Sequence, residues 1–146
     1  MITHIPFKIL AIDNEGYHLL LKLHINRKVS KVIIDTGASK TVFDKTRIEK
    51  LVNHKNFDSH DQLSSGLGTN TMESQTTIIK KLKLGDLEII NYKTVLLDLS
   101  HVNQSYQLIG LKPIDGVLGS DILFQYNAII NYEKKLLTLK YKKIKK

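Results

Sequence analysis

One segment near the start of the chain alternates between apolar and polar positions with the period of a half-buried strand. In residues 17–26 the odd positions 19, 21, 23 and 25 carry Leu or Ile, whereas the even ones include His18, Lys22 and His24. This period of two predicts a strand. An earlier strand is expected over residues 5–12, with a turn at residues 13–16 between the two.

The apolar pattern of the remaining chain predicts more strands and little helix. A turn at residues 26–28 leads to a strand over 29–34, and further strands are expected over 71–84, 87–99, 128–132 and 136–141. Short helices are expected over 45–52, capped by Asp44, and over 121–125, capped by Ser120. Residues 53–70 and 100–113 read as irregular. The pattern therefore predicts a single, mainly β domain with one or two short helices.

The strand over residues 29–34 ends in Val-Ile-Ile and runs directly into Asp35-Thr36-Gly37. A carboxylate at the end of a buried strand is costly unless hydrogen bonds or a function retain it. We expect Gly37 to permit a tight turn and the close approach of another chain. The pattern predicts a carboxylate held rigidly in a crowded place, with the Thr36 hydroxyl beside it.

One carboxylate alone is a poor catalyst of hydrolysis. Two carboxylates about 3 Å apart share a proton, so that one can act as a base on water while the other polarises a carbonyl. The chain holds a single Asp-Thr-Gly. A pair would therefore need Asp35 from a second copy, across a twofold axis.

Residues 35–39, Asp-Thr-Gly-Ala-Ser, resemble the catalytic motif of the retropepsin-like aspartic proteases. Residues 116–123, Gly-Val-Leu-Gly-Ser-Asp-Ile-Leu, resemble the second signature of that family. The resemblance runs from about residue 17 to residue 141 and is greatest to single-motif, cellular and bacterial-type members. It implies the closed, dimeric β-barrel of the acid proteases, as one domain over residues 1–146 that ends in a basic tail at 140–146.

The resemblance also implies roles for individual residues. Asp35 would be the catalytic acid and base, and the residues after it would support the active site: Thr36, Gly37, Ala38 and Ser39. Thr36 would form a hydrogen bond across the dimer axis, and Gly37 would let the substrate backbone lie close. The flap that closes over a bound peptide would have its tip at Gly66, Leu67 and Gly68, while Leu118 and Gly119 would pack behind the active-site loop.

The leading interpretation is a homodimeric aspartic endopeptidase that hydrolyses peptide bonds of a peptide or protein substrate through an activated water, without a cofactor. The first alternative is a catalytically inactive, dimeric peptide-binding or assembly module of the same fold, although a scaffold does not need the Asp35 carboxylate. The second alternative is a nucleic-acid-binding protein, suggested by a net charge of +8. The chain lacks interleaved aromatic and basic residues, which makes nucleic acid an unlikely partner.

Composition and residue spacing exclude several other kinds of site. The absence of cysteine excludes disulfides and thiolate sites. No metal site is expected, because His18 and His24 are roughly 20 Å apart along an extended strand. Asp115 and Asp121 flank the second signature, and we expect Asp121 in the first turn of a helix rather than in catalysis. The N-terminal segment has no long apolar stretch, so we expect a cytoplasmic protein without a membrane partner.

Overall fold

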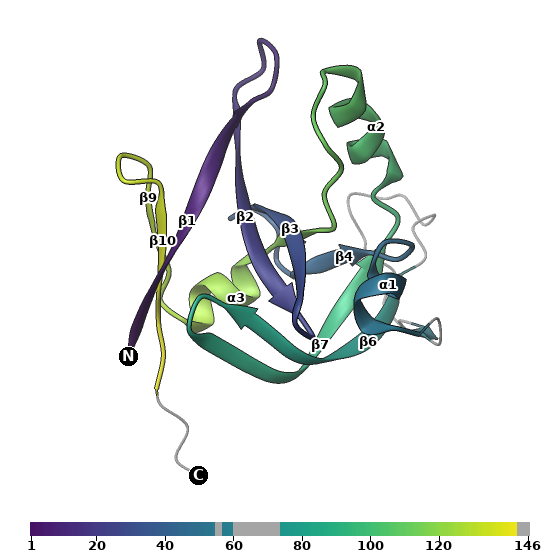
Figure 1. Ribbon diagram of the computed structural model, residues 1–146, viewed down its shortest axis with the longest axis vertical. Helices are drawn as coiled ribbons and strands as arrows, with labels where there is room; N and C mark the ends of the chain where they lie inside the picture. Colours follow the sequence, from purple (N-terminus) through teal and green to yellow (C-terminus); the bar gives the residue numbers. More distant parts are fainter. Residues whose placement is uncertain (55–56, 60–73, 143–146) are drawn as a thin grey trace.

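The computed structural model describes residues 1–54, 57–59 and 74–142, which form ten strands and three helices (Figure 1). The strands are β1 (Ile2–Ala11), β2 (Tyr17–Ile25), β3 (Lys28–Ile34), β4 (Val42–Asp44), β5 (Asp58–Ser59), β6 (Gln75–Leu84), β7 (Leu87–Leu97), β8 (Gly116–Leu118), β9 (Ile129–Asn131) and β10 (Leu136–Lys140). The helices are α1 (Ile48–Val52), α2 (Ser100–Leu108) and α3 (Ser120–Gln125).

Six of these strands close into a barrel. Their order is β6-β7-β4-β8-β3-β2, and β2 pairs again with β6 to complete the ring. β1 belongs to two sheets, because its second half pairs with β2 and its first half pairs with β10, which in turn pairs with β9. The expected mainly β, closed-barrel architecture is confirmed.

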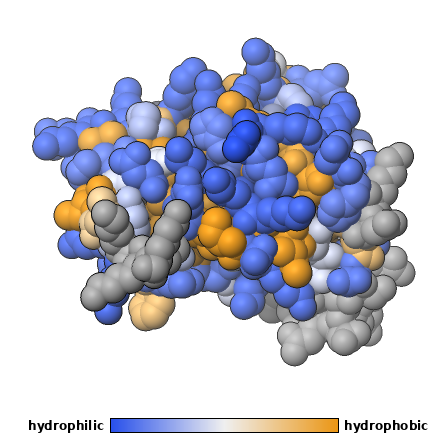
Figure 2. Space-filling model, turned by 60° about the horizontal axis from the view of Figure 1, so that its bottom comes forward, coloured by the Kyte–Doolittle hydropathy of each residue, from blue (hydrophilic) through white to orange (hydrophobic). Residues whose placement is uncertain are grey.

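The alternation along β2 separates the inside of the barrel from its outside. Leu21, Leu23 and Ile25 are fully buried, whereas Lys22 and His24 between them are exposed. Each such buried side chain contributes about 1.5–3 kcal/mol relative to an exposed one. The face of the molecule in Figure 2 is mostly hydrophilic, with hydrophobic residues in small separate patches.

The sequence pattern did not predict β4. This strand has three residues, too few to show a period, and it is held by partners far away in the chain: Val42 lies opposite Val117 on one side and Val95 on the other. The hairpin turns, in contrast, lie where they were expected. At the turn between β6 and β7, Gly85 has φ +60°, and a Cβ there would lie 2.3 Å from the Thr3 hydroxyl oxygen, so only glycine fits.

The helices correct three predictions. α1 begins later than expected, and Asp44 instead accepts a hydrogen bond from the Arg47 N–H (2.9 Å) in the turn before it. Ser120 is the first residue of α3, and the position before it, Gly119, provides no side-chain cap. The segment at residues 100–113 is not irregular, since most of it forms α2. Three helices therefore stand where one or two were expected.

The two ends of the described chain lie side by side. The Tyr141 N–H donates to the Met1 carbonyl oxygen (2.9 Å), and the Met1 amino group donates to the Tyr141 carbonyl oxygen. The first residue of the expected basic tail, Lys140, is the last residue of β10, while residues 143–146 lie outside the described part. No helix in the described ranges is long and apolar enough to span a bilayer.

Candidate active site

Asp35 follows β3 at the point where this strand runs parallel to β8. Ile34 lies opposite Leu118, and the Asp35 N–H donates to the Leu118 carbonyl oxygen (2.9 Å). Leu118 is fully buried. The two motifs that lie some eighty residues apart in the chain are therefore neighbours in the barrel, and the second one packs behind the loop that carries Asp35.

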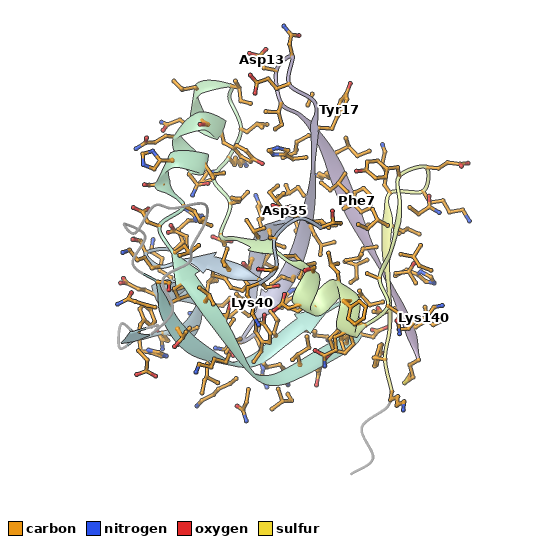
Figure 3. All side chains as sticks on the ribbon, turned by 180° about the vertical axis from the view of Figure 1, so that it is seen from behind. Phe7, Asp13, Tyr17, Asp35, Lys40 and Lys140 are labelled. Atoms are coloured by element: carbon orange, nitrogen blue, oxygen red, sulfur yellow. The ribbon has the colours of Figure 1, made fainter. Side chains whose placement is uncertain are left out.

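Within one chain, Asp35 is exposed together with Thr36 and Gly37. The expectation of a crowded carboxylate is therefore wrong for the single chain. The three apolar residues before Asp35 are buried in the sheet, but the chain leaves the sheet at Asp35 and emerges as a loop (Figure 3). One carboxylate oxygen, Oδ1, is held by a hydrogen bond from the Gly37 N–H (3.0 Å).

Gly37 is not required by the turn. Its φ is not among the positive values of the chain, and a Cβ there would meet only Asp35 Oδ1, at the ordinary contact distance of 3.4 Å. The tight turn expected at this position therefore does not explain the glycine. The close approach of another chain, which the sequence also suggested, stays a prediction.

The active-site loop, residues 35–41, is fixed from behind by the start of α3. The Ser120 N–H donates to the Ala38 carbonyl oxygen (2.7 Å). A Cβ on Gly119 would lie 2.5 Å from the Lys40 carbonyl oxygen and 2.8 Å from that of Ala38, so the backbones could not pack this closely around another residue. Ala38 supports the loop through its backbone, while Ser39 is exposed.

A hydrogen-bond network that the sequence did not reveal anchors the far end of this loop. The Asp121 carboxylate accepts hydrogen bonds from the Thr41 N–H (2.9 Å), the Thr41 hydroxyl (2.8 Å) and the Tyr92 hydroxyl (2.5 Å). Burial and the neighbouring Asp121 carboxylate raise the pKa of Tyr92 well above its usual range. Asp121 does lie in the first turn of α3, as expected, but its partners show that it also holds the loop.

Asp115, the other acid beside the second signature, has structural partners. Its carboxylate accepts from the Arg47 Nε (2.7 Å), the Lys31 N–H (2.8 Å) and the Ser30 hydroxyl (3.2 Å). This ion pair and these hydrogen bonds tie the segment before β8 to β3 and to the start of α1. These contacts give Asp115 a structural role.

A cavity of roughly 380 Å³ borders Asp35. Asp35 and Thr36 line one part of it, and Ile33, Val102 and Tyr106 are among the residues of its other walls. Figure 3 places Asp35 below Tyr17, which also lines the cavity, between α2 on one side and β1 on the other. The site thus combines an exposed carboxylate with a pocket large enough for a side chain, lined by both apolar and polar groups.

Two further expectations concern the flap and metals. Gly66, Leu67 and Gly68, the predicted flap tip, lie outside the described residues, so their role stays a prediction. Among the residues that the structure describes, no three His, Asp or Glu side chains gather in a way that could hold a metal ion. His18 is hydrogen-bonded through Nδ1 to the Tyr106 hydroxyl instead (2.5 Å).

The family model described as "Aspartyl protease" matches residues 21–122, more than half of the chain, and this range includes the first motif and all but the last residue of the second. The chain belongs to the aspartyl protease family. No curated protein sequence matches it significantly.

Solved structures share the fold of this aspartyl protease family member. A retropepsin-like aspartic protease from Rickettsia conorii matches with a TM-score of 0.57 at 21% identity, over 95% of this chain and 91% of that one. The retroviral protease-like domain of Ddi1 from Leishmania major matches with a TM-score of 0.59 at 17% identity, over 84% and 87%. EIAV protease in complex with the inhibitor HBY-793 matches with a TM-score of 0.52 at 22% identity, over 77% and 91%. The resemblance to retropepsin-like proteases is confirmed.

Proposed function

We propose that the chain is an aspartic endopeptidase whose catalytic pair consists of two Asp35 carboxylates, one from each subunit of a homodimer. The observation that carries this proposal is an exposed Asp35 on a loop that is fixed from behind, at the rim of a pocket. Rigid placement of a reacting group lowers the barrier because its positioning is already fixed before the reaction.

The reaction needs one ionised and one protonated carboxylate. The ionised Asp35 takes a proton from water as the water oxygen bonds to the peptide carbonyl carbon, while the protonated Asp35 of the other subunit donates a hydrogen bond to the carbonyl oxygen. When the C–N bond breaks, a proton passes to the leaving nitrogen. The hydrogen bond from the Gly37 N–H to Oδ1 fixes the orientation of each carboxylate for these steps.

The homodimer follows from the single motif and from the surface around it. Asp35, Thr36 and Gly37 form a continuous exposed stretch, and the Thr36 hydroxyl has no hydrogen-bond partner within the described residues. A twofold axis beside this stretch would bring two carboxylates together and give each Thr36 a partner in the other subunit. The expected homodimer and the role of Thr36 across its axis rest on this argument.

The alternative is a dimeric module of the same fold that binds peptides without cleaving them. It shares the pocket and the dimer with the protease but has no use for the Asp35 carboxylate. Turnover of a bound peptide therefore distinguishes the two functions.

The test is cleavage of a mixed peptide library by the wild type, Asp35→Asn and Asp13→Asn. Asp35→Asn keeps the size of the side chain and removes the ionisable group, so we expect cleavage to fall about 10²–10⁴-fold. Asp13 is an exposed aspartate in a hairpin turn, with a φ of 47° that asparagine also tolerates, so Asp13→Asn should cleave like the wild type.

Each result has a clear consequence. A folded Asp35→Asn variant with wild-type activity would exclude the aspartic mechanism. Peptide binding without turnover by the wild type, under conditions where sedimentation shows a dimer, would favour the non-catalytic module.

A further inference from the structure

Another pocket lies on the outer surface of the barrel, where the C-terminal end of β2 pairs with β6 (Figure 1). It has a volume of about 460 Å³, and we call it the basic groove. The charged and ionisable side chains that line it are Lys22, His24, Arg27, Lys81, Lys83 and Glu88. Four Lys and Arg side chains therefore share this groove with one carboxylate.

The pairing of the strands aligns these cations across the outer face of the barrel. Lys22 lies opposite Lys31 of β3, and His24 lies opposite Lys83 of β6. Side chains of like charge that lie directly opposite each other destabilise a sheet. The Lys22–Lys31 pair therefore lowers the stability of the fold, and the residues of the groove are not explained by what the sheet itself needs.

The single carboxylate does not neutralise the groove. Glu88 Oε1 lies 3.8 Å from Lys81 Nζ, and the two side chains are 45% and 40% exposed, so this ion pair is weak. Among the described residues, no carboxylate lies within ion-pair distance of Lys22, Arg27 or Lys83. The groove therefore keeps a surplus of positive charge that attracts anions.

Arg27 occupies a backbone position that does not suit an arginine. Asn26 and Arg27 form the two-residue turn between β2 and β3, with φ values of 49° and 72°. Such turns need positive φ at both positions and favour Asn followed by Gly, because a Cβ makes the left-handed conformation unfavourable. An arginine in a strained conformation, with its side chain at the lining of a pocket, indicates a function in binding.

We propose that the basic groove binds an acidic segment of a partner protein, in an extended conformation with Asp or Glu at alternate positions. Alternate side chains of an extended chain lie about 6.6 Å apart on one face. Lys81 and Lys83 are alternate residues of β6, and Lys22 and His24 are alternate residues of β2. Successive carboxylates of the segment thus meet successive cations, and the Arg27 guanidinium binds one of them through two parallel hydrogen bonds.

Other anionic partners fit the groove less well. Single-stranded nucleic acid binds where aromatic side chains stack on its bases, and no aromatic side chain is among the described residues that line the groove. An anionic membrane is a broad surface that attracts protruding cations, whereas Lys81 and Lys83 are half-buried along the walls of a concave site. A single peptide strand is narrow enough to lie between these walls.

The groove is remote from the proposed catalytic site. β3 begins directly after Arg27 and ends directly before Asp35, and its seven residues span roughly 20 Å. Binding at the groove goes beyond the proposed endopeptidase function and does not require Asp35. Failure of one proposal therefore leaves the other intact.

The test is a titration of the full chain into a fluorescently labelled peptide of alternating Glu and Ser, followed by anisotropy. We expect saturable binding that weakens about fivefold or more between about 50 and 200 mM NaCl, because exposed ion pairs are screened by salt. A peptide of alternating Gln and Ser should not bind. The Asp35→Asn variant should bind the acidic peptide with an unchanged dissociation constant.

The decisive variant combines Lys22→Gln with Lys83→Gln. Glutamine removes the charge without placing a new carboxylate opposite Glu88. We expect the dissociation constant to rise at least about fivefold, the effect of two lost exposed ion pairs. The matched control combines Lys8→Gln with Lys134→Gln, at exposed positions outside the groove. It lowers the net charge equally and should change the dissociation constant less than about twofold.

Arg27→Gly tests whether the strained arginine serves binding. Glycine suits the positive φ, so this variant should be no less stable than the wild type in urea. Its dissociation constant for the acidic peptide should nevertheless rise at least about threefold, from the loss of one ion pair. Unchanged affinity in a folded Arg27→Gly variant would contradict the role of Arg27 in the groove.

Competing anions distinguish the classes of partner. The acidic peptide is compared with a single-stranded oligonucleotide, a DNA duplex and vesicles of phosphatidylserine and phosphatidylcholine. Tightest binding of the peptide, weakened by the double variant and not by its control, would support the inference. Tighter binding of an oligonucleotide or of vesicles, equal effects of the double variant and its control, or loss of peptide binding in Asp35→Asn would overturn it.

Discussion

At the scale of single residues, the loop that carries Asp35 is firmly attached on one side and open on the other. Behind it, the Leu118 carbonyl, the Ser120 N–H and the Asp121 carboxylate are all bonded to loop residues. In front of it, Asp35 and Thr36 face the pocket and solvent. Such an arrangement keeps the carboxylate in place while leaving it accessible from solvent.

The Tyr92–Asp121 hydrogen bond should contribute to stability without involving Asp35. Tyr92→Phe removes one donor to a carboxylate that retains two others from Thr41, so we expect a loss of about 1–3 kcal/mol in the free energy of unfolding. Asp121→Ala should cost more, because it leaves the Tyr92 and Thr41 donors unpaired. Urea unfolding measures both, and equal stability of Asp121→Ala and the wild type would contradict this account.

Tyr106 should make the stability of the fold depend on pH in the alkaline range. Burial raises the pKa of Tyr106 to about 12, from 10.0 for an ordinary tyrosine. Between these values the unfolded chain has released the proton and the folded chain has kept it. The stabilising contribution is therefore complete below about pH 10 and is lost as the pH rises toward 12, by up to about 2 kcal/mol.

The measurement is urea unfolding at constant protein concentration, from about pH 8 to pH 11, for the wild type and Tyr106→Phe. The wild type should lose stability more steeply with pH than the variant, which cannot ionise at this position. Parallel curves would show that Tyr106 ionises equally well in the folded and unfolded chain.

At the scale of elements, the sequence predicted the strands and helices that have a clear local pattern of apolar residues. The strands β1 and β2 could be predicted because their exposed and buried positions alternate, and β3 could be predicted from its final run of three β-branched residues. α2 could not, because a single buried residue, Tyr106, produces no helical period. The sequence pattern also could not predict that Asp35 is exposed, since an apolar run before a residue does not show where the chain leaves the sheet.

Two glycines of the site should respond differently to alanine because they lie on different sides of the loop. Gly119→Ala places a Cβ 2.5 Å from a backbone carbonyl oxygen, and we expect it to lower the free energy of unfolding by about 1–3 kcal/mol. Gly37→Ala meets only an ordinary contact and should change stability by less than about 0.5 kcal/mol.

Peptide cleavage tests the role of Gly37 separately from its effect on stability. If another chain approaches Gly37 closely, Gly37→Ala should lower peptide cleavage although the fold keeps its stability. A Gly37→Ala variant with unchanged stability and unchanged kcat/KM would show that neither turn geometry nor close approach explains this glycine.

At the scale of the whole molecule, the resemblance to retropepsin-like proteases predicted the closed barrel, which no local pattern contains. The parallel pairing of β3 with β8 joins residues about eighty positions apart. In the sequence, the only indication of this pairing is the presence of the two motifs in this order. Neither the local sequence pattern nor the resemblance predicted that the side sheet β1-β10-β9 forms within one chain and ends in β9. That free edge adjoins the pocket beside Asp35, because Ile130 and Tyr132 line this pocket.

The edge of β9 should take part in the proposed homodimer. An edge strand presents unpaired backbone groups that a second copy can pair with, and Ile129 on this strand is 50% exposed. Antiparallel pairing of two β9 strands about a twofold axis would also bring both pockets toward that axis. We expect Ile129→Asp to raise the dimer dissociation constant at least tenfold, about 1.4 kcal/mol.

The matched control is Leu108→Asp, which makes the same change of charge at an exposed leucine of α2 and should leave the dimer unchanged. Sedimentation across a range of protein concentrations measures both, with urea unfolding to confirm that each variant is folded. A folded Ile129→Asp variant that dimerises as tightly as the wild type would place the interface elsewhere on the molecule.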